Sequence, residues 1–146
     1  MSDVQRAVAV FKEGYSCSQA ILSTYGKRIG LKREVALKIA GGFGGGIGRM
    51  GKTCGAVTGA VMVIGLQFGM VDLADKDAKE QTYALVREFM DRFTALHGST
   101  ECKELLGCNL NTPEGFLYAK EQNLFVTICQ ELVQHAAELL EELIFK

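Results

Sequence analysis

Five cysteines are the residues of this sequence with the broadest chemistry, because a thiolate is both a nucleophile and a metal ligand. They are Cys17, Cys54, Cys102, Cys108 and Cys129. No two of them have the CxxC spacing of a redox or zinc motif, and there is no CxxCH for haem attachment. In a reducing compartment such thiols are more often catalytic, redox-sensing or metal-binding than joined in disulfides. A free cysteine can equally be a small buried apolar residue.

Three cysteines fall in the first turn of an expected helix, where the helix dipole and unpaired amides favour a negative charge. In each case a hydroxyl residue that can cap the helix comes first: Ser16 before Cys17, Thr53 before Cys54, and Ser99 and Thr100 before Cys102. We therefore expect lowered pKa values for these thiols. Arg49 and Lys52 lie within a few residues of Cys54, which is predicted to be the most reactive thiol.

The remaining cysteines and the two histidines carry weaker signals. Cys129 lies within the last expected helix, residues 124–144, on or beside its apolar face. Cys108 follows the glycine that ends a short helical turn and has the least distinctive surroundings. His97 lies at a helix end and His135 on the last helix, where surface or capping roles are expected.

A glycine-rich segment, residues 41–59, leads the chain to Cys54. It reads GGFGGGIGRMGKTCGAVTG and holds nine of the seventeen glycines. Glycine loses more backbone freedom on folding than any other residue. Such a loop therefore indicates that the backbone approaches another group closely.

Two nucleotide-binding patterns occur in this segment. Residues 46–53 match GxxxxGK[ST], and residues 46–51 match GxGxxG. Both motifs need a preceding strand in a parallel sheet, whereas residues 31–40 are predicted to be helical. No nucleotide site is expected here, although amides at a helix start beside Arg49 and Lys52 could hold an anion.

The spacing of apolar residues and helix caps predicts an all-α fold in one domain, residues 1–146, with about five to six helices. The central helix is expected to be the Gly/Ala-rich one that starts at Cys54 and is capped by Thr53, since its small residues allow close packing. Three further helical segments are expected before it, at residues 3–13, 17–25 (ended by Gly26) and 31–40. After it, we expect a helix that is capped by Asp72 or Asp75 and ends at Gly98, and then a helical turn at residues 101–106. The last two helices are expected to start at Thr112-Pro113 and to span residues 124–144.

Composition and charge bear on the classes of partner. The net charge is −1, which gives no argument for nucleic acid or an anionic membrane. The N-terminus has acidic residues and no apolar stretch of signal-peptide length, so a cytoplasmic protein is predicted. Residues 54–71 carry no charge, but their glycines and borderline length fit a buried core helix better than a membrane span. No membrane insertion is expected, and a homodimer is compatible with the sequence but not indicated by it.

The chain resembles the C_GCAxxG_C_C family of small redox-active proteins. The residues that carry the resemblance are Gly14–Ala20, Gly42–Gly46, Cys54–Gly59, Cys102–Gly107 and Cys129. The resemblance implies that the four cysteines of the family are Cys17, Cys54, Cys102 and Cys129, and that Cys108 is an extra. It implies a redox role and supplies no substrate, and residues 51–53 lie outside the family pattern.

Three functions remain open on the sequence. The first is a thiol redox protein in which two of the four family cysteines cycle between dithiol and disulfide, with Cys54 as the attacking thiolate. The sequence does not show whether such a protein is an enzyme (a thiol–disulfide oxidoreductase) or what its redox partner is. The second is a metal or iron–sulfur site held by all four thiolates, although no closely spaced ligand pair is present. The third is a non-catalytic helical binding module.

Overall fold

The computed structural model describes residues 1–145, and within them every regular element is a helix. The helices are α1 (Asp3–Lys12), α2 (Cys17–Arg28), α3 (Arg33–Ala40), α4 (Gly55–Phe68), α5 (Lys76–His97), α6 (Cys102–Leu106), α7 (Pro113–Glu121) and α8 (Leu124–Leu143). The all-α prediction is confirmed, but these residues form eight helices rather than five to six. Each of the eight corresponds to a helical segment expected from the sequence, so the number of five to six was too low. Helices α3, α6 and α7 each have fewer than ten residues.

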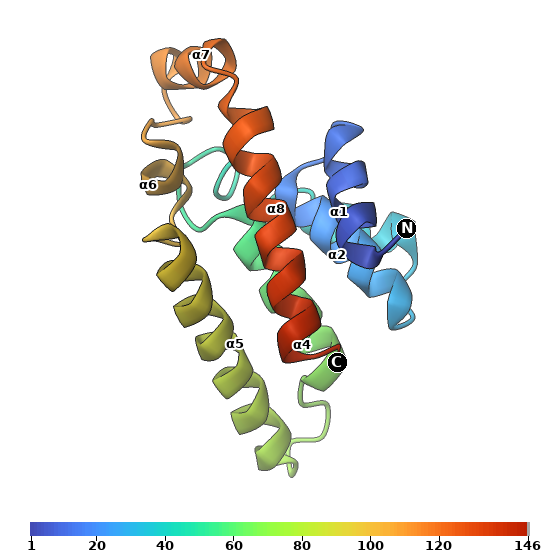
Figure 1. Cartoon of the computed structure of the whole chain (residues 1–146). Coiled ribbons are helices and arrows are strands. Elements are labelled where there is room, and N and C mark those ends of the chain that lie inside the picture. Colours follow the sequence, from blue (N-terminus) through green and yellow to red (C-terminus); the bar gives the residue numbers. More distant parts are fainter. Residues whose placement is uncertain (146) are drawn as a thin grey trace.

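Helix α4 lies at the centre of the bundle. It packs most extensively against α2 and also contacts α5 and α8, while α1 packs on α2 and α8. Figure 1 shows α8 running across the bundle, with α5 on one side and α1 and α2 on the other. Among residues 1–145, no helix combines the length and the apolar character needed to cross a membrane.

Two glycines of α4 account for its close approach to α2. A Cβ atom added at Gly59 would lie 3.0 Å from Cβ of Ile21 and 3.1 Å from the carbonyl oxygen of Ser18. One added at Gly55 would lie 3.0 Å from the amide nitrogen of Ser18. These separations leave no room for a side chain, so the small residues of α4 serve helix packing, as the sequence predicted.

Several predicted helix ends are confirmed. The side chains of Ser16, Asp75 and Thr112 cap α2, α5 and α7. Gly98 ends α5 with φ +82°, a conformation that glycine adopts readily.

Two other predicted helix boundaries are wrong. Helix α2 continues past Gly26 to Arg28, because Gly26 is a close-packing site beside Leu31 rather than a stop. Cys54, not Thr53, is the N-cap of α4, since Thr53 is held in an isolated antiparallel bridge with Glu101.

The two histidines join α5 to α8. Nδ1 of His135 and Nε2 of His97 lie 3.0 Å apart, and the two rings stack with centroids 4.9 Å apart. Burial, and then the charge of His135, lower the pKa of His97. Surface or capping roles were expected for these residues, and the structure shows instead a half-buried pair that links two helices.

Candidate functional site

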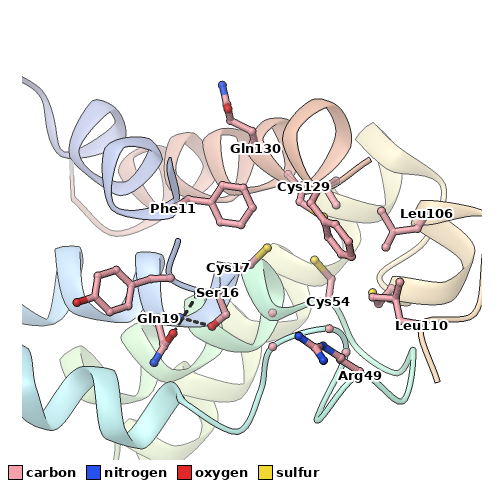
Figure 2. Close-up of a pocket in the computed structure, with 18 of the residues that line it drawn as sticks. Phe11, Ser16, Cys17, Gln19, Arg49, Cys54, Leu106, Leu110, Cys129 and Gln130 are labelled. Carbon is pink, nitrogen blue, oxygen red and sulfur yellow. Dashed lines mark hydrogen bonds between the residues drawn. The ribbon is translucent and has the colours of Figure 1, made fainter. Parts of the chain in front are cut away.

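A single cavity brings together the four cysteines that the sequence singled out. It has a volume of about 910 Å³ and is lined by Cys17, Cys54, Cys102 and Cys129. These residues come from four places in the chain: the start of α2, the N-cap of α4, the start of α6 and the middle of α8. Figure 2 shows the sulfur atoms of Cys17 and Cys54 pointing into the same space, with Phe11 on one side and Arg49 on the other.

Cys17 is positioned by the polar residues around it. The Ser16 side chain accepts a hydrogen bond from the amide of Gln19, and the Gln19 side chain accepts one from the amide of Ser16. This capping box makes Cys17 the first residue of α2. The buried Ser18 hydroxyl donates to the carbonyl of Ala40 over 2.9 Å. The start of α2 is thereby tied to the end of α3, where the glycine-rich loop begins.

Cys54 is brought to Cys17 by the glycine that follows it. A Cβ atom at Gly55 would lie 3.2 Å from Cβ of Cys17. A larger residue at position 55 would therefore force the start of α4 away from the start of α2. Gly55 is thus what allows the two cysteines to lie side by side.

Cys102 is held to the same loop by backbone contacts. The amide of Cys54 donates to the carbonyl of Thr100 over 2.8 Å, and the amide of Cys102 donates to the carbonyl of Lys52 over 2.6 Å. Gly46 has φ +73°, and a Cβ atom there would lie 2.7 Å from Cβ of Cys102. The glycine-rich loop therefore lets the chain pass close beside a cysteine. No strand precedes this loop, as helix α3 leads into it.

Cys17 is the central member of a group of three thiols. Hydrogen-bonding interaction with Cys129 and then with Cys54, followed by burial, raises its pKa well above the ordinary value. At Cys54 the net effect on the pKa has the opposite sign. The hydrogen bond from Cys17 lowers the pKa of Cys54, burial opposes this, and the amides of Ala56 and Val57 lower it further by hydrogen bonding to the thiolate. The group therefore favours a thiolate at Cys54 beside a protonated Cys17.

The expectation of lowered pKa values is confirmed for one cysteine and wrong for two. The pKa of Cys54 is lowered, whereas that of Cys17 is raised. Burial, followed by the charges of neighbouring thiolates, raises the pKa of Cys102 to about 12. Helix α6 has only five residues, so its dipole is too weak to offset the loss of hydration.

The two cations near Cys54 in the sequence do not act as expected. The lowered pKa of Cys54 arises from Cys17 and from backbone amides, not from Arg49 or Lys52. Arg49 lies at the cavity and places its guanidinium carbon 4.5 Å from the centroid of the Phe116 ring. Lys52 does not line the cavity.

Cys108 has a more specific setting than the sequence indicated. It packs against a small apolar cluster that contains Cys102 and Cys129. Burial, followed by the charge of Cys129, raises its pKa. It does not line the cavity, however. Gly107, which precedes Cys108, ends α6 with φ +69°.

The aromatic wall of the cavity could not be read from the sequence. Phe11, Phe116 and Phe125 come from α1, α7 and α8, and all three line the cavity. The rings of Phe116 and Phe125 lie 5.7 Å apart in a tilted arrangement. These residues lie on separate helices, and no local sequence pattern indicates that they share a site. Among residues 1–145, no three or more His, Cys, Asp or Glu side chains are grouped so as to hold a metal ion.

Comparison with known proteins gives one match. The family model described as "Putative redox-active protein (C_GCAxxG_C_C)" matches residues 15–143. No curated protein and no solved structure matches the chain. The matched range contains all four cysteines that line the cavity. Because the match covers most of the chain, the protein belongs to the C_GCAxxG_C_C family, whose description supports a redox role.

Proposed function

We propose that this protein is a thiol redox protein whose active dithiol is Cys54 and Cys17. The observation that carries the proposal is that both sulfur atoms point into the same space where α2 and α4 meet (Figure 2). There the interaction between them lowers the pKa of Cys54 and raises that of Cys17. A dithiol in which one sulfur is ionised and its neighbour is protonated is suited to stepwise exchange. Cys54 is the attacking thiolate, and Cys17 is the resolving thiol.

The chemistry divides into two steps. The Cys54 thiolate attacks a sulfur of an oxidised substrate, forming a mixed disulfide and releasing a substrate thiolate. The Cys17 thiol then gives up its proton and attacks Sγ of Cys54, which forms the Cys17–Cys54 disulfide and releases the second substrate thiolate. The protein loses two electrons and the substrate gains them. A low pKa favours the attacking thiol, while the protonated state of Cys17 keeps it in reserve until the second step.

The other two cavity cysteines have supporting roles in this scheme. Cys129 makes the largest contribution to the raised pKa of Cys17, so it holds Cys17 in the protonated form. Cys102 has a pKa of about 12 and is 7% exposed. At neutral pH it remains a thiol and forms part of the cavity wall.

A redox titration tests the proposal. The protein is equilibrated in glutathione buffers of stepped potential, quenched in acid, and its free thiols are counted by maleimide gel shift. Two thiols are expected to disappear in one two-electron transition, and both Cys54→Ser and Cys17→Ser should abolish it. Cys108→Ser is the matched control and should retain it, because Cys108 lies outside the cavity. An unchanged thiol count across the buffers, or a transition that survives in Cys54→Ser, contradicts the proposal.

A second candidate is a metal or iron–sulfur site formed by Cys17, Cys54, Cys102 and Cys129. It is favoured by one observation, the convergence of four thiols on one cavity, since four thiolates are the usual ligand set for zinc or a cluster. The sulfur atoms would have to move closer together, because residues 1–145 contain no group already arranged to hold an ion. Metal analysis and absorbance spectra of protein purified without oxygen distinguish the two candidates. Stoichiometric metal that is lost in Cys102→Ser would favour the second.

A further inference from the structure

We propose that the cavity beside Cys54 binds a small organic anion with an apolar or aromatic body, and that the redox substrate is a disulfide of this class. This inference rests on the proposed function for its redox part. Its binding part stands on the charge, shape and depth of the cavity.

Apart from the Cys54 thiolate, the charged side chains that line the cavity are all cations. Lys12, Arg49 and Lys120 line it, and no Asp or Glu does. The whole chain has 17 acidic and 16 basic residues, so this asymmetry is a local property of the cavity and not of the composition. Among residues 1–145, none of the three cations forms an ion pair. Their charges are therefore available to a ligand, and an anion is the complementary one.

An aromatic surface lies directly below two of these cations. The guanidinium carbon of Arg49 is 4.5 Å and Nζ of Lys120 is 5.8 Å from the centroid of the Phe116 ring. Phe11 and Phe125 also line the cavity. A ligand with an apolar body can therefore contact the rings while its anionic group reaches the cations at the edge. This combination of an apolar wall and a few charged groups is typical of small-molecule sites.

The depth of Cys54 favours a small substrate. Cys54 is 3% exposed, so the surface of a folded protein cannot bring a disulfide into contact with its sulfur. The cavity volume of about 910 Å³ lies within the range of roughly 300–1,000 Å³ that small-molecule sites occupy. A molecule of that size can reach Cys54 from within the cavity.

The reaction follows the exchange steps given above, with a named class of oxidant. The Cys54 thiolate attacks one sulfur of an organic disulfide, RSSR, and one RS⁻ leaves as the mixed disulfide forms. The Cys17 thiol loses its proton, attacks Sγ of Cys54 and expels the second RS⁻. The proton from Cys17 is available to one of the two thiolates. One protein dithiol is oxidised and one organic disulfide is reduced, so electrons and protons balance.

Two aromatic disulfides that differ in charge test the redox part. The anionic probe is 5,5′-dithiobis(2-nitrobenzoate), and the neutral one is 2,2′-dithiodipyridine. Each rate with the protein is divided by the rate with the uncharged thiol N-acetylcysteine amide at the same pH in 0.15 M salt, which removes the intrinsic reactivity of the probe. The normalised rate is expected to be about tenfold higher for the anionic probe. In Arg49→Gln this preference should fall about fivefold, which corresponds to ~1 kcal/mol.

Matched variants distinguish the effect of a cation that lines the cavity from the effect of a cation elsewhere in the glycine-rich loop. Lys52→Gln removes a cation from the same loop that does not line the cavity, and it should leave the preference for the anionic probe unchanged. Lys120→Gln provides a second cavity variant on a different helix, so that the outcome does not depend on correct folding of Arg49→Gln alone. Equal normalised rates for the two probes, or equal effects of Arg49→Gln and Lys52→Gln, overturn the inference.

A separate binding experiment distinguishes failure of the anion-site inference from failure of the proposed dithiol function. Cys54→Ser cannot exchange disulfides, so its binding of the anionic fluorophore 8-anilinonaphthalene-1-sulfonate reports the cavity alone. Binding that weakens about fivefold when Arg49→Gln is added supports the anion site even if no Cys17–Cys54 disulfide forms in the wild type. Formation of that disulfide with no effect of Arg49→Gln on either probe rejects the anion site and leaves the dithiol function standing.

Discussion

Cys17 and Cys54 lie side by side at the point where the first turns of α2 and α4 meet, with both sulfur atoms in the same space (Figure 2). The contact has opposite effects on its two members, because the hydrogen bond stabilises a thiolate at Cys54 and retains the proton at Cys17. Gly55 permits this contact by leaving space beside Cβ of Cys17. The chemical difference between two identical side chains thus originates in how two helices pack.

The first prediction concerns the order in which the cysteines react. With substoichiometric iodoacetamide at pH 7, Cys54 should be alkylated first among the cavity thiols, because the thiolate is the reactive form and its pKa is lowered. Cys102, with a pKa of about 12, should be alkylated much more slowly than Cys54. Isotope-coded alkylation followed by peptide mass spectrometry measures both rates.

A pair of variants identifies the cause of this reactivity. Cys17→Ala removes the donor to the Cys54 thiolate and should slow alkylation of Cys54 several-fold. Cys108→Ala removes a thiol outside the cavity and should leave that rate unchanged. Alkylation of Cys102 as fast as Cys54 would be incompatible with the proton distribution described above.

The second prediction concerns the contact between α2 and α4. Gly59→Ala should destabilise the protein by about 1–3 kcal/mol, because the added Cβ atom would lie 3.0 Å from Ile21 and 3.1 Å from the Ser18 carbonyl. Gly65→Ala is the matched control in the same helix, since nothing lies within 4 Å of its added Cβ atom. It should be neutral or stabilise by up to about 1 kcal/mol. Urea unfolding measures both, and equal effects of the two substitutions would refute this explanation of the glycines.

The third prediction separates two reasons for glycine in the loop. Gly46 and Gly48 both have positive φ, so alanine at either position costs about 1–2 kcal/mol in backbone strain. Only at position 46 would the new Cβ atom also meet Cys102, at 2.7 Å, and the Lys52 amide, at 2.6 Å. Gly46→Ala should therefore cost about 2–5 kcal/mol in unfolding free energy and should disturb the alkylation rate of Cys102. Gly48→Ala should show the strain alone, and a similar loss for both would rule out the close approach as the cause.

The fourth prediction concerns the histidine pair. The pKa of His97 is lowered from its ordinary value of 6.5 by burial and by the charge of His135, against the opposing effect of Glu131. Since the folded state disfavours the proton, the stability contributed by this group is present above about pH 6.5 and is lost as pH falls through the lower folded pKa. The urea midpoint of the wild type should fall over this range. His97→Gln should flatten that part of the profile, and an unchanged slope in the variant would show that His97 is not responsible.

The sequence alone predicted the helical class and most helix boundaries, because these depend on local signals. Ser16 with Gln19, Thr112 with Pro113, and Gly98 each act within one turn of the chain. The boundaries at Gly26 and Cys54 were predicted wrongly because each depends on a partner outside its own helix. Gly26 packs on Leu31, and the segment before Cys54 pairs with residues 100–102.

The convergence of the cysteines on one cavity is a tertiary property that residue types alone could not establish. The helix dipole suggested lowered pKa values, but burial and neighbouring thiols reverse that effect at Cys17 and Cys102. The cationic and aromatic lining could not be predicted either, because Arg49 and Phe116 lie in separate segments of the chain and meet only in the tertiary structure.

The most direct test of the account is to identify the disulfide that forms first. The reduced protein is treated with one equivalent of a mild oxidant, free thiols are blocked in acid, and linked peptides are mapped by mass spectrometry. The account predicts that a Cys17–Cys54 disulfide predominates and that Cys102 and Cys108 remain free. A first disulfide that excludes Cys54, or the recovery of all five cysteines as free thiols, would contradict it.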